Sequence, residues 1–176
     1  TLKFMVNCYK YAPNEYFVLN LFGLISSSTQ NFQDCLVYFL KSLECERNSV
    51  AHANLGYLYS QELVPENPPS EITFDISLEG GHTDRGSKSF YHLKEAIALN
   101  SNDFQSISNL ANLLFSNKLY SEAIETFKLL PNWDGNEGLI KAYYANEDYD
   151  DFISIVNKSL LLEEFINSRH VSAILS

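Results

Sequence analysis

Histidine is the residue of this chain whose chemistry would first suggest catalysis or metal binding, because its ring can move protons or ligate a metal near neutral pH. The four histidines are scattered along the sequence at His52, His82, His92 and His170. Their spacing matches no metal-ligand motif. His52 falls on the packing face of an expected helix, so we interpret it as a core side chain.

An acidic turn near residue 150 could suggest a bound cation. Calcium loops need oxygen ligands at alternating positions and a glycine hinge, and Asp148, Asp150 and Asp151 complete neither. We interpret them as a solvated turn. The pair Gly80-Gly81 lacks the flanking strand and helix of a phosphate-binding loop. The sequence therefore predicts no cofactor, no metal ion and no enzyme activity.

The charge balance excludes several classes of partner. With 22 acidic and 12 basic residues, the chain has a formal net charge of -10, which would repel nucleic acid and anionic membrane surfaces. No apolar run approaches the ~20 residues of a membrane helix. The three cysteines fit a reducing compartment better than a disulfide framework. We expect a soluble intracellular protein, cytoplasmic or nuclear.

A repeated helix-pair pattern supplies the elements that would position any functional side chain. Its clearest copy begins at Phe104 and turns at Asn117-Lys118. Ala123 and Phe127 follow Ala111 at 12 and 16 residues, which places a small and then a large residue on one face of a second helix. Small side chains let two antiparallel helices approach closely, and the large ones fill the space beside them.

The same pattern can be laid along the chain four times. Cys35 and Phe39 follow Gly23 at the same 12 and 16 residues. A second copy starts around Gly56, is interrupted, and resumes before the copy at Phe104. A fourth, more degenerate copy is expected from Leu139.

Three stretches resemble the tetratricopeptide-repeat family, whose units are roughly 34 residues long. Residues Leu55–Tyr59, Glu122–Ile124 and Ala96–Asp103 match its helix-pair signature, turn and exit. The stretched second pair leaves the Sel1-like variant of the family as an alternative. The resemblance implies an all-α fold, a right-handed solenoid of antiparallel helix pairs in a single section spanning residues 1–176. About four pairs are expected, with partial repeats at both ends.

The partial repeats are expected at the two termini. Thr1–Tyr11 is predicted to be a second helix without its partner, and Glu163–Ser176 a further first helix or a cap. Because the chain starts without a methionine, we expect a processed product or an excerpt of a longer protein.

A loop insertion at residues 61–86 interrupts the second helix pair. It is marked by Pro65, Pro68, Pro69, Gly80, Gly81 and Gly86, which a packed helix does not tolerate. Inside it the apolar residues Ile72, Phe74, Ile76 and Leu78 alternate with polar ones, the period of an extended strand. One interpretation is a loose loop tip, and the other is a segment lying extended against the protein's own groove or a partner.

The resemblance also implies where a partner binds, because first helices line the concave surface of such solenoids. The faces expected there include Phe17, Leu24, Val50, Ser108 and Glu137 and, as predicted partner-binding residues, Asn20, Asn54, Tyr57, Gln105, Asn109, Asn112 and Lys141. Asparagine amides both donate and accept hydrogen bonds, which suits an extended peptide backbone.

The wall positions of the first three pairs hold no lysine or arginine. A desolvated carboxylate would be costly there, which argues against the family's grip on acidic chaperone tails and favours a neutral or basic protein or peptide. The leading hypothesis is a noncatalytic protein–protein interaction scaffold, a section of a larger subunit in a multi-protein assembly. The alternatives are an adaptor that binds a short peptide in its concave groove and, last, an enzyme on a helical framework.

Overall fold

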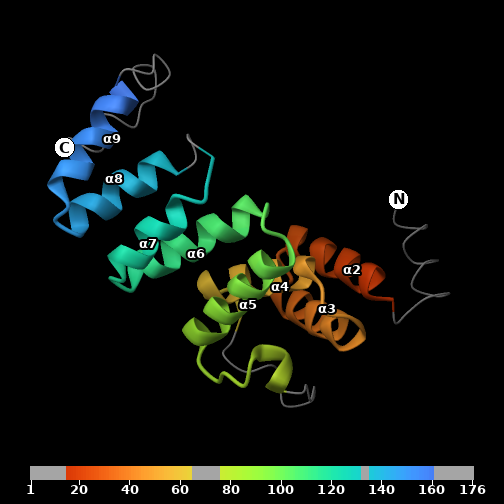
Figure 1. Ribbon diagram of the computed structural model, residues 1–176. Helices are drawn as coiled ribbons and strands as arrows, with labels where there is room; N and C mark the ends of the chain where they lie inside the picture. The colour runs from red at the N-terminus through yellow and green to blue at the C-terminus, as the bar shows by residue number, and fades with distance from the viewer. Residues whose placement is uncertain (1–14, 65–75, 132–134, 161–176) are drawn as a thin grey trace. The chain divides into compact units, whose positions relative to one another are not determined.

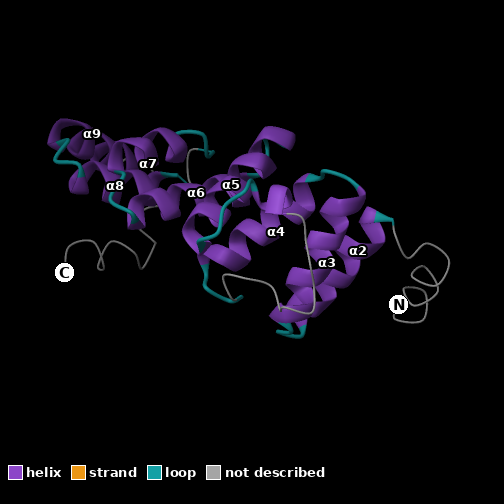
Figure 2. Ribbon diagram, turned by 90° about the horizontal axis from the view of Figure 1, so that it is seen from below, coloured by secondary structure: helices purple, strands orange, loops and turns teal. Residues whose placement is uncertain are grey.

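All regular structure that the computed structural model describes is helical. It describes residues 15–64, 76–131 and 135–160, and within these ranges no strand occurs (Figures 1 and 2). This confirms the all-α prediction. The predicted partial repeats at Thr1–Tyr11 and Glu163–Ser176 lie outside the described residues.

The chain divides into two compact units, residues 1–109 and 110–176, with the boundary inside one helix. The described helices of the first unit are α2 (Tyr16–Ser28), α3 (Phe32–Cys45), α4 (Ser49–Ser60), the 3-10 helix η1 (Ile76–Glu79), α5 (Arg85–Leu99) and the start of α6 (Phe104–Ser116). Helix α2 packs against α3, α3 against α4, and α4 against α5. Packing between helices that follow one another is the behaviour expected of a helical repeat.

The second unit contains the end of α6, α7 (Tyr120–Phe127), α8 (Asn136–Ala145) and α9 (Tyr149–Leu160). Here α7 packs against α8, and α8 against α9. A single solenoid over the whole chain, and its right-handed sense, remain predictions.

The same turn closes α2, α4, α6 and α8. Each helix is followed by a residue with a positive φ, namely Gln30 (59°), Glu62 (54°), Lys118 (63°) and Glu147 (64°). The next backbone N–H then donates to the carbonyl five residues earlier, in Asn31 to Ser26, Leu63 to Leu58, Leu119 to Leu114 and Asp148 to Tyr143. This is a Schellman cap. The four copies recognised in the sequence therefore share one local structure at the turn, including the predicted turn at Asn117-Lys118.

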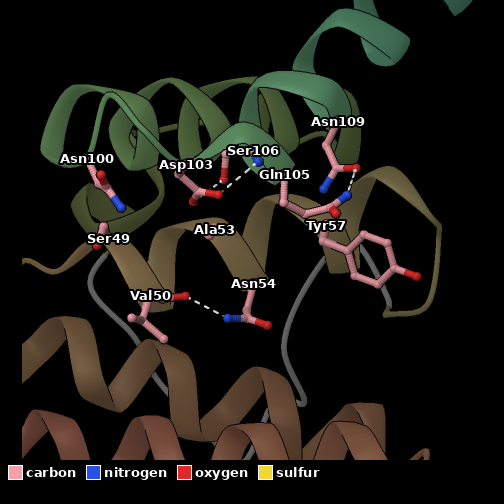
Figure 3. Close-up of a pocket in the computed structure, with 10 residues that line it drawn as sticks. All are labelled: Ser49, Val50, Ala53, Asn54, Tyr57, Asn100, Asp103, Gln105, Ser106 and Asn109. Atoms are coloured by element: carbon pink, nitrogen blue, oxygen red, sulfur yellow. Dashed lines mark hydrogen bonds between the residues drawn. The ribbon is translucent and has the colours of Figure 1, made fainter. Parts of the chain in front are cut away.

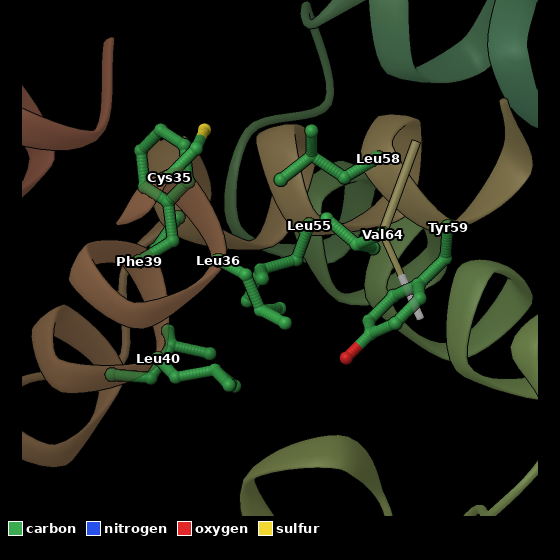
Figure 4. Close-up of a cluster of buried hydrophobic side chains, with 10 residues drawn as sticks. Cys35, Leu36, Phe39, Leu40, Leu55, Leu58, Tyr59 and Val64 are labelled. Carbon is green, nitrogen blue, oxygen red and sulfur yellow. The ribbon is translucent and has the colours of Figure 1, made fainter. Parts of the chain in front are cut away.

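The core of the first unit lies where α3 and α4 meet (Figure 4). It contains Cys35, Leu36, Phe39 and Leu40 of α3, with Leu55, Leu58 and Tyr59 of α4. The steric argument from the sequence is confirmed at two close approaches. A Cβ atom on Gly23 would lie 2.7 Å from the Phe39 ring, and one on Gly56 would lie 2.7 Å from Leu93 Cγ.

The expectation of an extended segment in the insertion is wrong for its described part. Residues Ile76–Glu79 form η1, and Gly80 and Gly81 follow with φ of +64° and +75°. The turn has a physical reason, because it brings the Glu79 carboxylate into a buried ion pair with Lys88 of α5. The preceding alternating residues Ile72 and Phe74 lie outside the described residues.

Candidate binding site

A pocket of about 650 Å³ lies between α4 and the start of α6 (Figure 3), and we call it the α4–α6 pocket. Its walls are Ser49, Val50, Ala53, Asn54 and Tyr57 of α4, Asn100 and Asp103 of the α5–α6 turn, and Gln105, Ser106 and Asn109 of α6. All ten residues belong to the first compact unit. Figure 3 shows Asn100 and Asp103 toward one end and Tyr57 toward the other, with Asn54 between them.

A helix cap fixes the Asp103 end of the pocket. Asp103 Oδ1 accepts a hydrogen bond from the Ser106 backbone N–H at 3.1 Å, and Oδ2 accepts one from the Ser106 hydroxyl at 2.7 Å. Aspartate is a preferred residue at this position, because it satisfies an otherwise unpaired N–H and its charge is favourable at a helix N-terminus. The half-buried carboxylate of Asp103 is therefore held in one orientation in the pocket wall.

The α4 wall begins at a second cap. Asn48 Oδ1 accepts a hydrogen bond from the Ala51 N–H at 2.9 Å. Asn48 is therefore the N-cap of α4, whose first helical residue is Ser49. One turn on, Asn54 Nδ2 donates to the Val50 carbonyl at 2.8 Å. That bond holds the Asn54 side chain against its own helix and leaves Oδ1 to accept a hydrogen bond from a ligand.

On the α6 wall two amides are paired with each other. Gln105 Nε2 donates to Asn109 Oδ1 at 3.1 Å. This arrangement leaves Gln105 Oε1 as an acceptor and Asn109 Nδ2 as a donor. Together with Asn54, these side chains offer hydrogen-bonding groups of both kinds, which is what a peptide backbone requires.

The one charged residue in the pocket wall is acidic. Among the ten lining residues Asp103 carries the charge, and none is a lysine, arginine or histidine. The apolar part of the wall includes Val50 and Tyr57, each of which leaves 42% of its surface exposed. The site therefore combines amides, one carboxylate and exposed apolar surface.

Four of the seven predicted partner-binding residues meet in this pocket: Asn54, Tyr57, Gln105 and Asn109. Their binding role remains a prediction. Reasoning from the sequence missed Asn100 and Asp103, because it considered the faces of first helices alone, and on those helices it left out Ser49, Ala53 and Ser106. The turn immediately preceding α6 was the available signal.

Asn20 has to be corrected as a groove residue. Only 6% of its surface is exposed, and its Nδ2 donates to Asn48 Oδ1 at 2.9 Å. The amide therefore links α2 to the cap of α4, where it is not accessible to a partner.

The other two predicted residues, Asn112 on α6 and Lys141 on α8, are exposed and belong to the second unit. Lys141 forms an ion pair with Glu137 one turn earlier.

A second group of polar side chains is buried inside the first unit. Lys88 Nζ and Glu79 Oε2 are 3.0 Å apart, with 2% and 5% of their side chains exposed. The Tyr59 hydroxyl donates to Glu79 Oε1, and Lys88 lies over the Tyr59 ring. Burial and the bond to Glu79 raise the pKa of Tyr59, so the phenol keeps its proton.

His52 and His92 extend this buried polar cluster. The His92 ring stacks on Tyr59 with an interplanar angle of 9°. Burial lowers the pKa of His52 to about 4, an effect that Glu95 opposes and Arg47 reinforces. The pKa of His92 is well below its usual value because of burial, with further lowering by His52, Lys88 and His82. Both rings are therefore neutral near pH 7, and His52 is buried as its sequence position suggested.

The described residues hold neither a metal-binding cluster nor a helix that could span a membrane. No group of three or more histidine, cysteine, aspartate or glutamate side chains in them could hold a metal ion. None of the described helices is long and apolar enough to span a membrane.

Comparison with known proteins adds no family assignment. No protein-family model matches the chain, and no curated protein is significantly similar to it.

Proposed function

We propose that this chain is a noncatalytic protein-binding module that holds an extended segment of another protein in the α4–α6 pocket. The observation that supports this proposal is the convergence of Asn54 from α4 with Gln105 and Asn109 from α6 on one pocket. Their free amide groups present donors and acceptors to an occupant, and a peptide backbone carries one of each at every residue except proline.

The internal hydrogen bonds of the pocket favour this role. Because Asn54 is bonded to its own helix and Gln105 to Asn109, these side chains are already ordered before a ligand arrives. Ordering a long polar side chain at an interface costs about 0.5–1.5 kcal/mol, so a wall that is already ordered binds more tightly.

Direct binding measurements would test the proposal. Fluorescence anisotropy with a panel of labelled, unstructured peptides of neutral, basic and acidic composition should find binding to the full chain. The double substitution Asn54→Ala with Asn109→Ala should weaken that binding roughly tenfold, since each lost hydrogen bond contributes about 0.5–1.5 kcal/mol.

The matched control is Asn102→Ala, an exposed asparagine in the turn before α6 that does not line the pocket. It should leave the affinity unchanged. The proposal would be wrong if no peptide of the panel bound. It would also be wrong if the double variant and the unsubstituted chain bound the peptides with equal affinity.

A specific observation favours a second candidate, a structural scaffold in a larger assembly. Phe17, Leu21 and Leu24 on α2 leave 56%, 37% and 44% of their surfaces exposed. Their spacing places them on one face of the helix, where a large apolar contact with a partner subunit would bury them.

Salt separates the two candidates. Co-purification with a partner in fixed stoichiometry at high salt, lost on Phe17→Ser with Leu24→Ser, favours the scaffold. Weak binding that falls with added salt and depends on Asn54 and Asn109 favours the peptide-binding module.

A further inference from the structure

We propose that the segment held in the α4–α6 pocket carries a lysine or arginine side chain that pairs with Asp103 and an apolar side chain that lies against Tyr57. This inference rests on the proposed function and names the chemistry of the partner. It follows from the difference between the two ends of the pocket (Figure 3).

The Asp103 end of the pocket carries a negative charge. Asp103 is the one charged residue among those lining the pocket. Its two oxygens accept hydrogen bonds from Ser106, but a carboxylate offers about four lone-pair sites. It can therefore still accept from a cationic side chain, and charge-assisted bonds of this kind are among the stronger ones.

An acidic occupant is disfavoured for the same reason. A helix N-terminus attracts anions through its unpaired N–H groups, and Asp103 already occupies that role at the start of α6. A second carboxylate would lie near Asp103 in a wall without a lysine, arginine or histidine. Like charges at such a site repel, and the formal net charge of -10 adds to the effect.

Tyr57 sets the chemistry of the other end. This large aromatic residue leaves 42% of its surface exposed, and it borders the pocket at the end away from Asp103. An aliphatic side chain laid on this ring would remove apolar surface of both groups from water. Between the two ends, Asn54 and Gln105 can pair with the backbone of the segment.

Three peptides provide the test, the second and third each differing from the first in one side chain. The first is a labelled peptide of glycine, serine and threonine with one arginine and one leucine, blocked at both termini. The second replaces the arginine by citrulline, which keeps the shape and removes the charge. The third replaces the leucine by serine.

Binding is measured by fluorescence anisotropy on the full chain. We expect the arginine peptide to bind about five- to tenfold more tightly than the citrulline peptide, and the difference to shrink with added salt.

The decisive variant is Asp103→Asn. Asparagine caps a helix about as well as aspartate, so α6 keeps its start while the pocket loses its charge. The preference for arginine over citrulline should disappear. Asp84→Asn is the matched control, since Asp84 caps α5 through Ser87 at 2.8 Å and does not line the pocket. This variant should keep the full preference, and Tyr57→Ala should abolish the advantage of leucine over serine.

The outcomes separate the inference from the proposed function. If all the peptides bind equally and Asn54→Ala with Asn109→Ala weakens them all, the function stands and this inference is wrong. Unchanged discrimination by Asp103→Asn also overturns it. If no peptide binds, both fall.

Discussion

The Nδ1 atoms of His52 on α4 and His92 on α5 lie 2.9 Å apart inside the first compact unit. One ring must donate this hydrogen bond and the other accept it, so the two neutral rings are opposite tautomers. Among the described residues His92 Nε2 has no partner and is buried. An unpaired buried N–H is rarer than an unpaired acceptor, which favours the arrangement in which His92 carries its proton on Nδ1.

This pair predicts a loss of stability in mild acid. The pKa values of both rings are lower in the folded protein than the ordinary 6.5, so below that pH the unfolded chain binds more protons. The free energy of unfolding should therefore fall as the pH drops from 6.5 toward about 4, the pKa of His52. Each histidine adds about 1.4 kcal/mol per pH unit to the slope in this window.

Urea unfolding at a series of pH values would measure this slope. His92→Gln should reduce it, whereas His82→Gln, which leaves the pair intact and removes only the smallest of the four effects that lower the His92 pKa, should change it much less. An identical slope for His92→Gln and the unsubstituted chain would contradict the assignment of the acid sensitivity to this pair.

The buried ion pair predicts a strongly non-additive mutant cycle. Glu79→Gln should destabilise the protein by about 3 kcal/mol, because the Lys88 ammonium remains buried without this carboxylate. Replacing both residues, Glu79→Leu with Lys88→Met, should cost much less than the two single substitutions together. Chemical unfolding of Glu79→Leu, Lys88→Met and the double variant would show this, and additive losses would mean that the pair is not coupled.

The close contact between α4 and α5 leaves no room for a side chain at Gly56. A Cβ atom on Gly56 would lie 2.7 Å from Leu93 Cγ and 3.1 Å from the Leu93 backbone nitrogen. Gly56→Ala should therefore destabilise the protein by about 1–3 kcal/mol through overpacking.

Gly86→Ala is the matched control, because the nearest atom to its added Cβ is Asp84 Oδ1 at 3.5 Å. In the first turn of α5 it should be neutral or stabilise by up to about 1 kcal/mol. Equal melting temperatures for the two variants would show that the close approach at Gly56 can relax.

Substitution of Asn20 should change the stability of the protein without changing its affinity for a peptide. Its amide donates to the cap residue Asn48, so Asn20→Ala should lower the free energy of unfolding by about 1–2 kcal/mol. Peptide affinity at the α4–α6 pocket should not change. Lower peptide affinity with an unaltered free energy of unfolding would show that Asn20 takes part in binding.

Several features could be predicted because they depend on local sequence. The spacing of Gly23 and Phe39, and the matching spacing from Ala111 to Phe127, predicted helix pairs because close approach requires a small residue opposite a large one. Four of the seven predicted binding residues line one pocket for a related reason: helical periodicity decides which residues share a face.

Other features depend on contacts between residues far apart in the chain. The alternation at Ile76 and Leu78 favoured an extended segment, yet the buried pairing of Glu79 with Lys88 and Tyr59 accompanies a 3-10 turn there. Asn20 and Asn54 look equivalent in the sequence. In the folded chain Asn20 is buried and bonded to Asn48, whereas Asn54 lies in the pocket wall.

The sequence by itself determined the helices, their pairing and an acidic chain without a recognisable catalytic motif, because these follow from periodicity, side-chain size and composition. The tertiary structure decided which polar residues are buried and which are accessible. Burial depends on what another element places against a side chain, and that information is distributed between α4, α5 and α6 rather than held in any one segment. The pairing of His52 with His92 and the place of Asp103 in the pocket wall are of this kind.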